Sequence, residues 1–209
     1  HSRIPSFEQG DNTHGKVSLK TGSFGLVNPT VYLEQKISDR LAASFSGEWL
    51  SADGRYPYVL HYGPSKNDSS SLEKRQNTDV QNLRLEGALF GKISPTSRAD
   101  ARIYYYRSER GLPGAVIFYN TDNASKQRLW DKTFFAQAHY LNDFTDKWAL
   151  QVNAKYNYGY QHYLDPAYLN SAGKLENFYR QHEGYGSVAL LYSPFPVLQL
   201  STAADLTSA

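Results

Sequence analysis

Few side chains of this sequence have the type and spacing that catalysis requires. It contains six histidines, none of which has the spacing of a zinc ligand. Ser69, Ser70 and Ser71 form a polar run rather than the strained turn of a nucleophile. The sequence identifies no serine partner for His139, and the absence of cysteine excludes thiolate chemistry. We therefore expect a protein that is not an enzyme.

Two further patterns suggest a cofactor only weakly. Residues 184–189 have the glycine spacing of a dinucleotide-binding turn, but they lie within a strand pattern that no helix follows. Oxygen-bearing side chains of the kind that calcium prefers stand at Asp11, Asn12, Asp122 and Asn123. Because they lack the spacing of a ligand loop, we expect no cofactor. A calcium site in the loops remains an open alternative.

Apolar and polar residues alternate along most of the chain, as in β-strands with two different faces. From Trp148 to Tyr160, apolar side chains occupy every second position, and mostly polar or small residues lie between them. The same pattern recurs elsewhere, and no segment shows a helical stripe. It predicts nine strands, at residues 16–24, 30–38, 40–51, 79–93, 98–109, 129–142, 147–162, 178–192 and 197–207.

The lengths of these strands and their connections favour a transmembrane barrel. Many of the strands exceed the roughly 5 or 6 residues of a globular strand and reach the about 9–11 that a tilted strand needs to cross a membrane. Short turns at 38–40, 94–97, 143–146 and 193–196 alternate with long polar connections at 52–78, 110–128 and 163–177. Outer-membrane barrels have short periplasmic turns and longer extracellular loops. The connection at 25–29 is the exception, a short one on the predicted outer side.

The composition agrees with a barrel. A net charge of +2, from 22 basic and 20 acidic residues, does not suggest a nucleic-acid partner. Aromatic residues make up 14% of the chain, and they gather near both predicted strand ends, as aromatic girdles would. The outer group is Trp49, Tyr104, Tyr105, Tyr106, Tyr158, Tyr160 and Tyr163, and the inner group is Phe144, Trp148, Tyr192 and Phe195. The core of a soluble all-β binding module is the alternative explanation.

We therefore predict an all-β fold, an antiparallel up-and-down β-barrel that spans a bacterial outer membrane. The sequence also resembles the TonB-dependent outer-membrane receptors, nearly throughout from about Gly15 and most specifically at residues 110–114. Residues 22–26, 39–40 and 51–54 resemble the first barrel strands of that family. The segments that resemble its Bacteroidetes branch are residues 104–116, 119–120 and 127–132.

The resemblance implies a barrel of about 22 strands filled by an N-terminal plug domain. It assigns residues 1–15 to a segment leading from a plug that the sequence does not contain, and residues 16–209 to the N-terminal part of the barrel. The implied partners are the plug, the remaining strands, the TonB complex acting through the plug, outer-membrane lipid and, as a further candidate, a surface lipoprotein. The first residues lack the apolar core of a signal peptide, so we expect a mature form or an internal fragment.

The function that the resemblance implies is active uptake of a bulky, scarce nutrient. Cobalamin is the expected cargo; siderophores, haem and glycans are alternatives within the family, and a passive porin or surface-binding barrel is the alternative outside it. Loop aromatics would stack on a large planar or hydrophobic ligand, and arginines would contact its anionic groups. The candidate contacts are Tyr56, Tyr58, Arg107, Arg110, Tyr119 and Asn120. That these residues only order the loops is an equally open interpretation.

Overall fold

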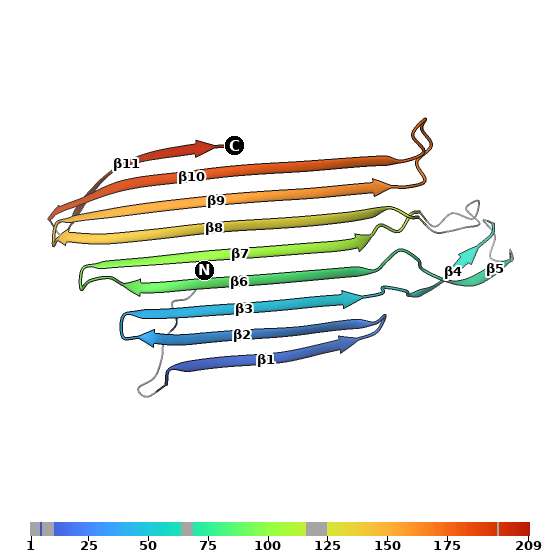
Figure 1. Cartoon of the computed structure of the whole chain (residues 1–209), viewed down its shortest axis with the longest axis horizontal. Coiled ribbons are helices and arrows are strands. Elements are labelled where there is room, and N and C mark those ends of the chain that lie inside the picture. Colours follow the sequence, from blue (N-terminus) through green and yellow to red (C-terminus); the bar gives the residue numbers. More distant parts are fainter. Residues whose placement is uncertain (1–4, 6–10, 64–68, 116–124, 196) are drawn as a thin grey trace.

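A single antiparallel sheet of nine long strands dominates the computed structural model, which describes residues 5, 11–63, 69–115, 125–195 and 197–209. Each strand lies beside its neighbours in chain order, as in an up-and-down barrel wall (Figure 1). All nine predicted strands are confirmed. They are β1 (Thr13–Gly22), β2 (Leu26–Ser38), β3 (Leu41–Ala52), β6 (Val80–Lys92), β7 (Ser97–Gly111), β8 (Arg128–Thr145), β9 (Trp148–Asp165), β10 (Leu175–Phe195) and β11 (Leu198–Ser208).

Two short strands were not predicted. β4 (Pro57–His61) and β5 (Ser70–Lys74) form a separate two-stranded sheet within the connection between β3 and β6. Each has only five residues, and β4 opens with a proline, which weakens a strand prediction. This hairpin projects beyond the end of the main sheet (Figure 1).

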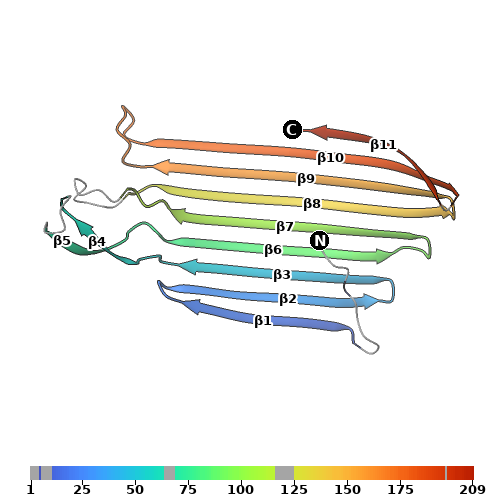
Figure 2. The same ribbon diagram turned by 180° about the vertical axis from the view of Figure 1, so that it is seen from behind.

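The connections alternate as predicted. Short turns join β2 to β3, β6 to β7, β8 to β9 and β10 to β11 at one end of the sheet, and the longer connections lie at the other end (Figure 2). The predicted exception is a tight turn between β1 and β2. The three shifts in strand register all lie beside short turns, between Lys36 and Ser38, Asp143 and Thr145, and Tyr192 and Phe195. Bulges of this kind add local twist to a sheet.

The apolar sides of neighbouring strands are in register, so they form one continuous face. Leu85 lies opposite Tyr105, Tyr105 opposite Phe134, and Phe134 opposite Tyr158. A one-residue slip in any pair would place apolar side chains on the opposite face. The sheet therefore has one apolar face and one polar face, and their separation is set by pairing as much as by sequence.

Nothing among the described residues covers the apolar face. Among the residues that the structure describes, the buried hydrophobic ones are only Leu60, Ala88 and Phe90, whereas Ile103 is 57% exposed and Trp148 is 40% exposed. A water-soluble sandwich would bury these side chains between two sheets. A single layer with an exposed apolar face instead requires an apolar environment on that side, such as membrane hydrocarbon. Within the described residues, no helix is long and apolar enough to cross a membrane.

The apolar face has the height of a membrane band. On β9, Trp148 and Tyr158 lie ten residues apart, or about 34 Å along the strand. A strand tilt of about 45° reduces this to roughly 25 Å, the height of the apolar band of outer-membrane barrels. At the short-turn end, Trp148 stacks on Tyr192 with ring centroids 4.2 Å apart, which matches the predicted inner girdle.

The predicted outer girdle needs one correction. Tyr105 lies on the apolar face, but Tyr104 and Tyr106 flank it in an extended strand and so lie on the polar face. Tyr163 lies on the polar face for the same reason, because it alternates with Tyr158 and Tyr160 along β9. The outer girdle of these strands consists of alternate aromatics, such as Tyr105, Tyr158 and Tyr160, rather than of the whole tyrosine cluster.

Candidate functional site

The polar face of the sheet holds charges of both signs that pair across strands. Arg84 on β6 bonds Glu48 on β3 at 3.2 Å, and His139 on β8 lies 3.2 Å from Asp100 on β7. Most of these groups are half-exposed, so each pair contributes little to stability, in the range of about 0–1 kcal/mol. The face therefore resembles a hydrated wall with polar groups available to a ligand or to another domain.

Aromatic side chains also stand on this polar wall. Tyr104 stacks on Phe135 with ring centroids 5.0 Å apart, and the Lys155 ammonium lies 5.8 Å from the Phe135 centroid. This group was not predicted as a binding site. The alternation of side chains along each strand could have revealed it, since Tyr104, Phe135 and Lys155 all lie at polar-face positions. Tyr104 stands opposite Phe135, and Lys155 is two residues from Asn157, the residue opposite Phe135 on β9.

An arginine joins the long connections at the outer end of the sheet. Arg128, the first residue of β8, donates to both carboxylate oxygens of Asp79, at 2.9 and 2.8 Å, and to Glu109 at 2.7 Å. Hydrogen bonds between charged groups are stronger than neutral ones. The arrangement ties the start of β6 and the end of β7 to β8, so it holds the bases of two loops together.

Asn77 forms a second tie at the same end. Its side-chain amide donates to the carbonyl of Leu112 at 3.0 Å and to that of Gln127 at 2.8 Å. The backbone there has no spare room, because a Cβ on Gly111 would overlap the Asn77 carbonyl oxygen. The loop between β3 and β6 is therefore packed against both ends of the loop between β7 and β8.

The two predicted tyrosines of the first long loop occupy its hairpin region. Tyr56 is 44% exposed, and its ring meets that of Phe24 edge-on with centroids 6.2 Å apart. Tyr58 lies on β4, opposite Glu73 of β5. Both lie at the end of the sheet that carries the long loops, and Tyr56 keeps an exposed surface that a ligand could contact.

The two predicted arginines lie on opposite faces of β7. Arg110 is on the polar face, where it pairs with Asp131 at 3.0 Å, and this contact supports the interpretation that it orders the wall. Arg107, three residues away along the extended strand, is on the apolar face. One ligand inside the barrel could therefore not contact both arginines. The reason is that residues an odd number of positions apart on a strand lie on opposite faces.

The remaining predicted positions cannot be placed. Tyr119 and Asn120, together with Asp122 and Asn123 of the calcium hypothesis, lie outside the described residues. Asp11 is described and lies 3.6 Å from His14. Among the described residues, no three histidine or carboxylate side chains are grouped closely enough to hold a metal ion.

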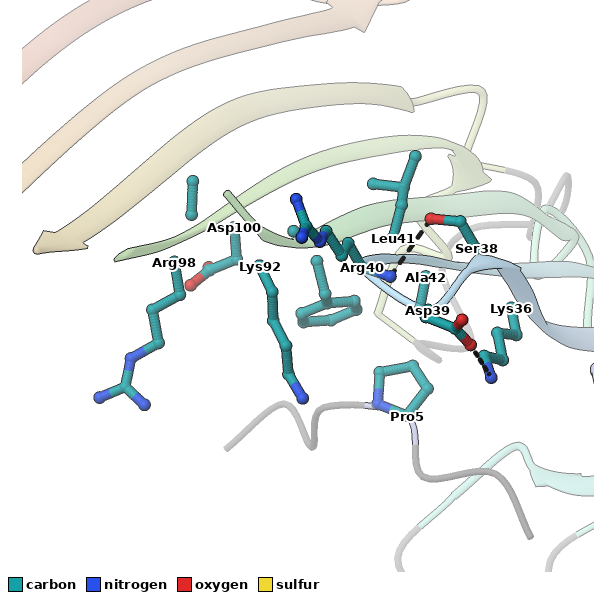
Figure 3. A pocket seen from close by; sticks show the side chains of 13 residues that line it. Pro5, Lys36, Ser38, Asp39, Arg40, Leu41, Ala42, Lys92, Arg98 and Asp100 are labelled. Atoms are coloured by element: carbon teal, nitrogen blue, oxygen red, sulfur yellow. Dashed lines mark hydrogen bonds and ion pairs between the residues drawn. The ribbon is translucent and has the colours of Figure 1, made fainter. Parts of the chain in front are cut away.

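A basic pocket lies on the polar face at the short-turn end. It has a volume of about 360 Å³ between the ends of β2, β3, β6 and β7, with Pro5 on its open side (Figure 3). Lys92 and Arg98 point toward the side of the sheet where Pro5 lies, and they stand directly opposite each other in the strand pairing. Like charges at paired positions repel, so this pocket would favour an anionic group.

One ion pair at the rim of this pocket can be tested by titration. The Lys36 ammonium hydrogen-bonds the Asp39 carboxylate at 2.7 Å, and it holds the pKa of that carboxyl below its ordinary value of 3.8. A lowered pKa in the folded state means that the stabilisation is present above the ordinary value and disappears as the pH falls through the lowered one. Lys36→Met should return the Asp39 pKa to its ordinary value, as measured by NMR of the carboxyl carbon.

The control for this titration is Arg40→Gln. It removes a neighbouring charge of the same turn that does not contribute to the Asp39 shift. The lowered pKa should persist in that variant. An Asp39 pKa that moves equally in both variants would show that the general field of the basic pocket, rather than the Lys36 contact, is responsible.

Comparison with solved structures supports the fold. The chain is similar to the ferric enterobactin receptor of Pseudomonas aeruginosa, with a TM-score of 0.56 and 10% identity over 97% of this chain and 32% of that one. It also matches an outer-membrane protein of Vibrio cholerae (TM-score 0.43, 13% identity, 96% of this chain and 51% of that one) and the toluene transporter of Pseudomonas putida (0.36, 10%, 89% and 57%). No family model and no curated protein matches the sequence.

The first of these similarities is close enough to describe the architecture. It aligns nearly all of this chain with about a third of the length of that receptor. Together with the two-faced sheet and its apolar band, it identifies the chain as part of the wall of a β-barrel of the bacterial outer membrane. The identity is too low for a residue of that receptor to be assigned to this chain.

Proposed function

We propose that this chain belongs to an outer-membrane receptor that imports a bulky, scarce nutrient by TonB-dependent transport. The observation that carries the proposal is the two-sided wall, whose polar face bears aromatic and charged groups and whose outer end holds long, mutually tied loops. Such a wall binds and guides a ligand without covalent chemistry. The similarity of fold to a ferric enterobactin receptor supports the same class of function.

The proposed mechanism assigns different tasks to the two ends of the wall. At the outer end, the exposed ring of Tyr56 and the neighbouring β4–β5 hairpin would contact the arriving ligand. At the periplasmic end, the basic pocket with Lys92 and Arg98 would receive acidic side chains of a plug domain, which would relieve their mutual repulsion. TonB would act on that plug, so release of the ligand would depend on the proton-motive force.

Cobalamin is the proposed cargo, on the strength of the resemblance of residues 104–116 to the Bacteroidetes branch of the receptor family. The test uses the bacterium from which the chain comes, with the gene that encodes it deleted or restored. Uptake of labelled cyanocobalamin should require the gene and should stop when a protonophore is added. A ferric siderophore and haem are tested in parallel.

The possible outcomes separate cargo from mechanism. Energy-dependent uptake of a siderophore or haem in place of cyanocobalamin would replace the cargo and keep the receptor. Uptake that continues in the presence of the protonophore, together with steady channel conductance of the purified protein in a planar bilayer, would show a passive porin and overturn the proposal.

The outer-loop tyrosines offer a more local prediction. Tyr56→Ala combined with Tyr58→Ala should weaken ligand binding by about tenfold or more, since truncation of a tyrosine that dominates a binding site costs about 2 kcal/mol or more. Binding of the cargo to whole cells is the measurement, and the amount of receptor in the membrane is checked alongside it. Tyr168→Ala removes an exposed loop tyrosine outside the predicted set and should leave the affinity unchanged. Equal losses in both variants would mean that the tyrosines act only through loop order.

A further inference from the structure

Three cations stand in one row on the apolar face, at the level of its outer aromatic side chains. Arg107 of β7 lies opposite Lys132 of β8, Lys132 opposite Tyr160 of β9, and Tyr160 opposite Arg180 of β10. The Lys132 ammonium lies 5.5 Å from the Tyr160 ring centroid, and the Arg180 guanidinium carbon lies 5.8 Å from it. Tyr160 is thus flanked by two positive charges, and a third charge continues the row. We name these four residues the outer basic row.

The position of the row relative to the membrane follows from the strand pattern. Arg107 lies two residues beyond Tyr105, Lys132 two residues beyond Phe134, and Tyr160 two residues beyond Tyr158, in each case toward the long-loop end. The inner girdle and Tyr158 already span the roughly 25 Å of the apolar band. The outer basic row therefore lies where the hydrocarbon ends and the lipid headgroups of the outer leaflet begin.

These cations have no carboxylate partner among the described residues. The nearest acidic groups on the same face of these strands are already engaged, Glu109 with Arg128 at 2.7 Å and Glu176 with Lys174 at 2.7 Å. Arg107 and Lys132 also face each other at paired positions, where like charges repel. An anion placed between them would remove that repulsion and supply the missing counter-charge.

We propose that the outer basic row binds the phosphate groups of a phosphate-bearing lipid in the outer leaflet. An arginine can hold two phosphate oxygens at once, Lys132 supplies a point charge, and the Tyr160 hydroxyl is an additional donor. The acyl chains of the lipid would lie along the apolar band below the row. Above it, the stacked rings of Trp130, His162 and Phe178, with centroid distances of 4.6 and 4.3 Å, would border the headgroup.

The test compares two triple variants of the complete receptor that contains this chain. In the first, Arg107→Gln, Lys132→Gln and Arg180→Gln remove the charges of the row. In the control, Lys16→Gln, Lys20→Gln and Lys155→Gln remove the same number of charges from the polar face. The proteins are purified in neutral detergent and titrated with lipid A, a glycolipid that carries two phosphates, and bound lipid is counted by native mass spectrometry.

The wild type and the control should bind lipid A equally, and the row variant should bind it about ten- to a hundredfold more weakly, given the roughly 1 kcal/mol that each basic side chain contributes near an anionic surface. Dephosphorylated lipid A should bind all three proteins weakly. Equal affinity of the row variant and the wild type, or undiminished binding of the dephosphorylated lipid, would overturn the proposal.

If the triple variant does not fold, Lys132→Gln alone should show a smaller loss, and an unchanged affinity in that variant would equally refute the site. Cargo uptake is not part of the readout, so failure of the transport proposal would leave this result interpretable.

Discussion

Replacing Val152 by arginine is expected to destabilise the membrane-inserted barrel by about 2–4 kcal/mol, the measured cost of a basic side chain on the lipid face near the middle of the bilayer. Val152 lies four residues beyond Trp148 and six before Tyr158 on β9, so its depth is near the centre of the apolar band. Its neighbours in the pairing are Tyr140 and Val188. None of these side chains could neutralise a guanidinium, which would have to lie in hydrocarbon or stretch to an interface.

The matched control is the adjacent residue. Asn153 has nearly the same depth, but its side chain lies on the polar face, where it donates to Ser187 at 3.0 Å and stands opposite His139. His139 contacts Asp100, so a carboxylate is near an arginine placed at position 153. Asn153→Arg should therefore lower stability by much less than Val152→Arg.

Unfolding by urea of the complete barrel in lipid vesicles measures both variants. The expected difference between them is most of the roughly 2–4 kcal/mol, which is about 30- to 800-fold in the folding equilibrium. Equal destabilisation by the two arginines would contradict the assignment of the faces. A larger loss for Asn153→Arg would mean that the apolar face is covered by protein and the polar face by lipid.

Gly54→Ala should distort the first long loop, for two separate reasons. Gly54 has φ of +65°, a conformation that costs an L-residue about 1–2 kcal/mol. A Cβ at this position would also overlap the carbonyl oxygen of Thr78 and lie 2.8 Å from the Thr78 Cβ. Relief of such an overlap requires the backbone to move, at a further cost of about 1–3 kcal/mol.

The movement would affect the hydrogen bonds that link the first long loop to the turn between β1 and β2. The amides of Asp53 and Gly54 both donate to the carbonyl of Phe24, at 2.9 and 3.2 Å, and Phe24 supports the ring of Tyr56. We expect Gly54→Ala to lower the affinity for the cargo and to make the first long loop more sensitive to added protease. The wall itself should remain folded, because Gly54 lies outside the long strands.

Gly173→Ala separates the two causes of the expected distortion, the positive φ and the steric overlap. Gly173 has φ of +66°, almost the same as Gly54, but no atom lies within 4 Å of the position that its added methyl group would occupy. This variant therefore bears the conformational cost without the overlap. Protease sensitivity near Gly54 that exceeds that near Gly173 would confirm the steric effect, and equal effects would attribute both to φ alone.

The sequence by itself determined the elements and their faces, because a strand is a local structure in which successive side chains point to opposite sides. The alternation around Val152 and the spacing of the turns were sufficient for all nine long strands. The parity of β7 likewise places Arg107 and Arg110 on opposite faces, although both were predicted to contact the same ligand. The β4–β5 hairpin was missed, since five-residue strands carry too little pattern to be distinguished from a loop.

Only the tertiary structure decided which residues of different strands meet. Tyr160 lies between Lys132 and Arg180 because of the registers of β8, β9 and β10, and a shift of register would break the row. Arg128 reaches Asp79 across 49 positions, a contact that no local pattern encodes. Pairing register depends on turn geometry and bulges acting together over many residues, so the candidate sites appear only when the whole sheet is assembled.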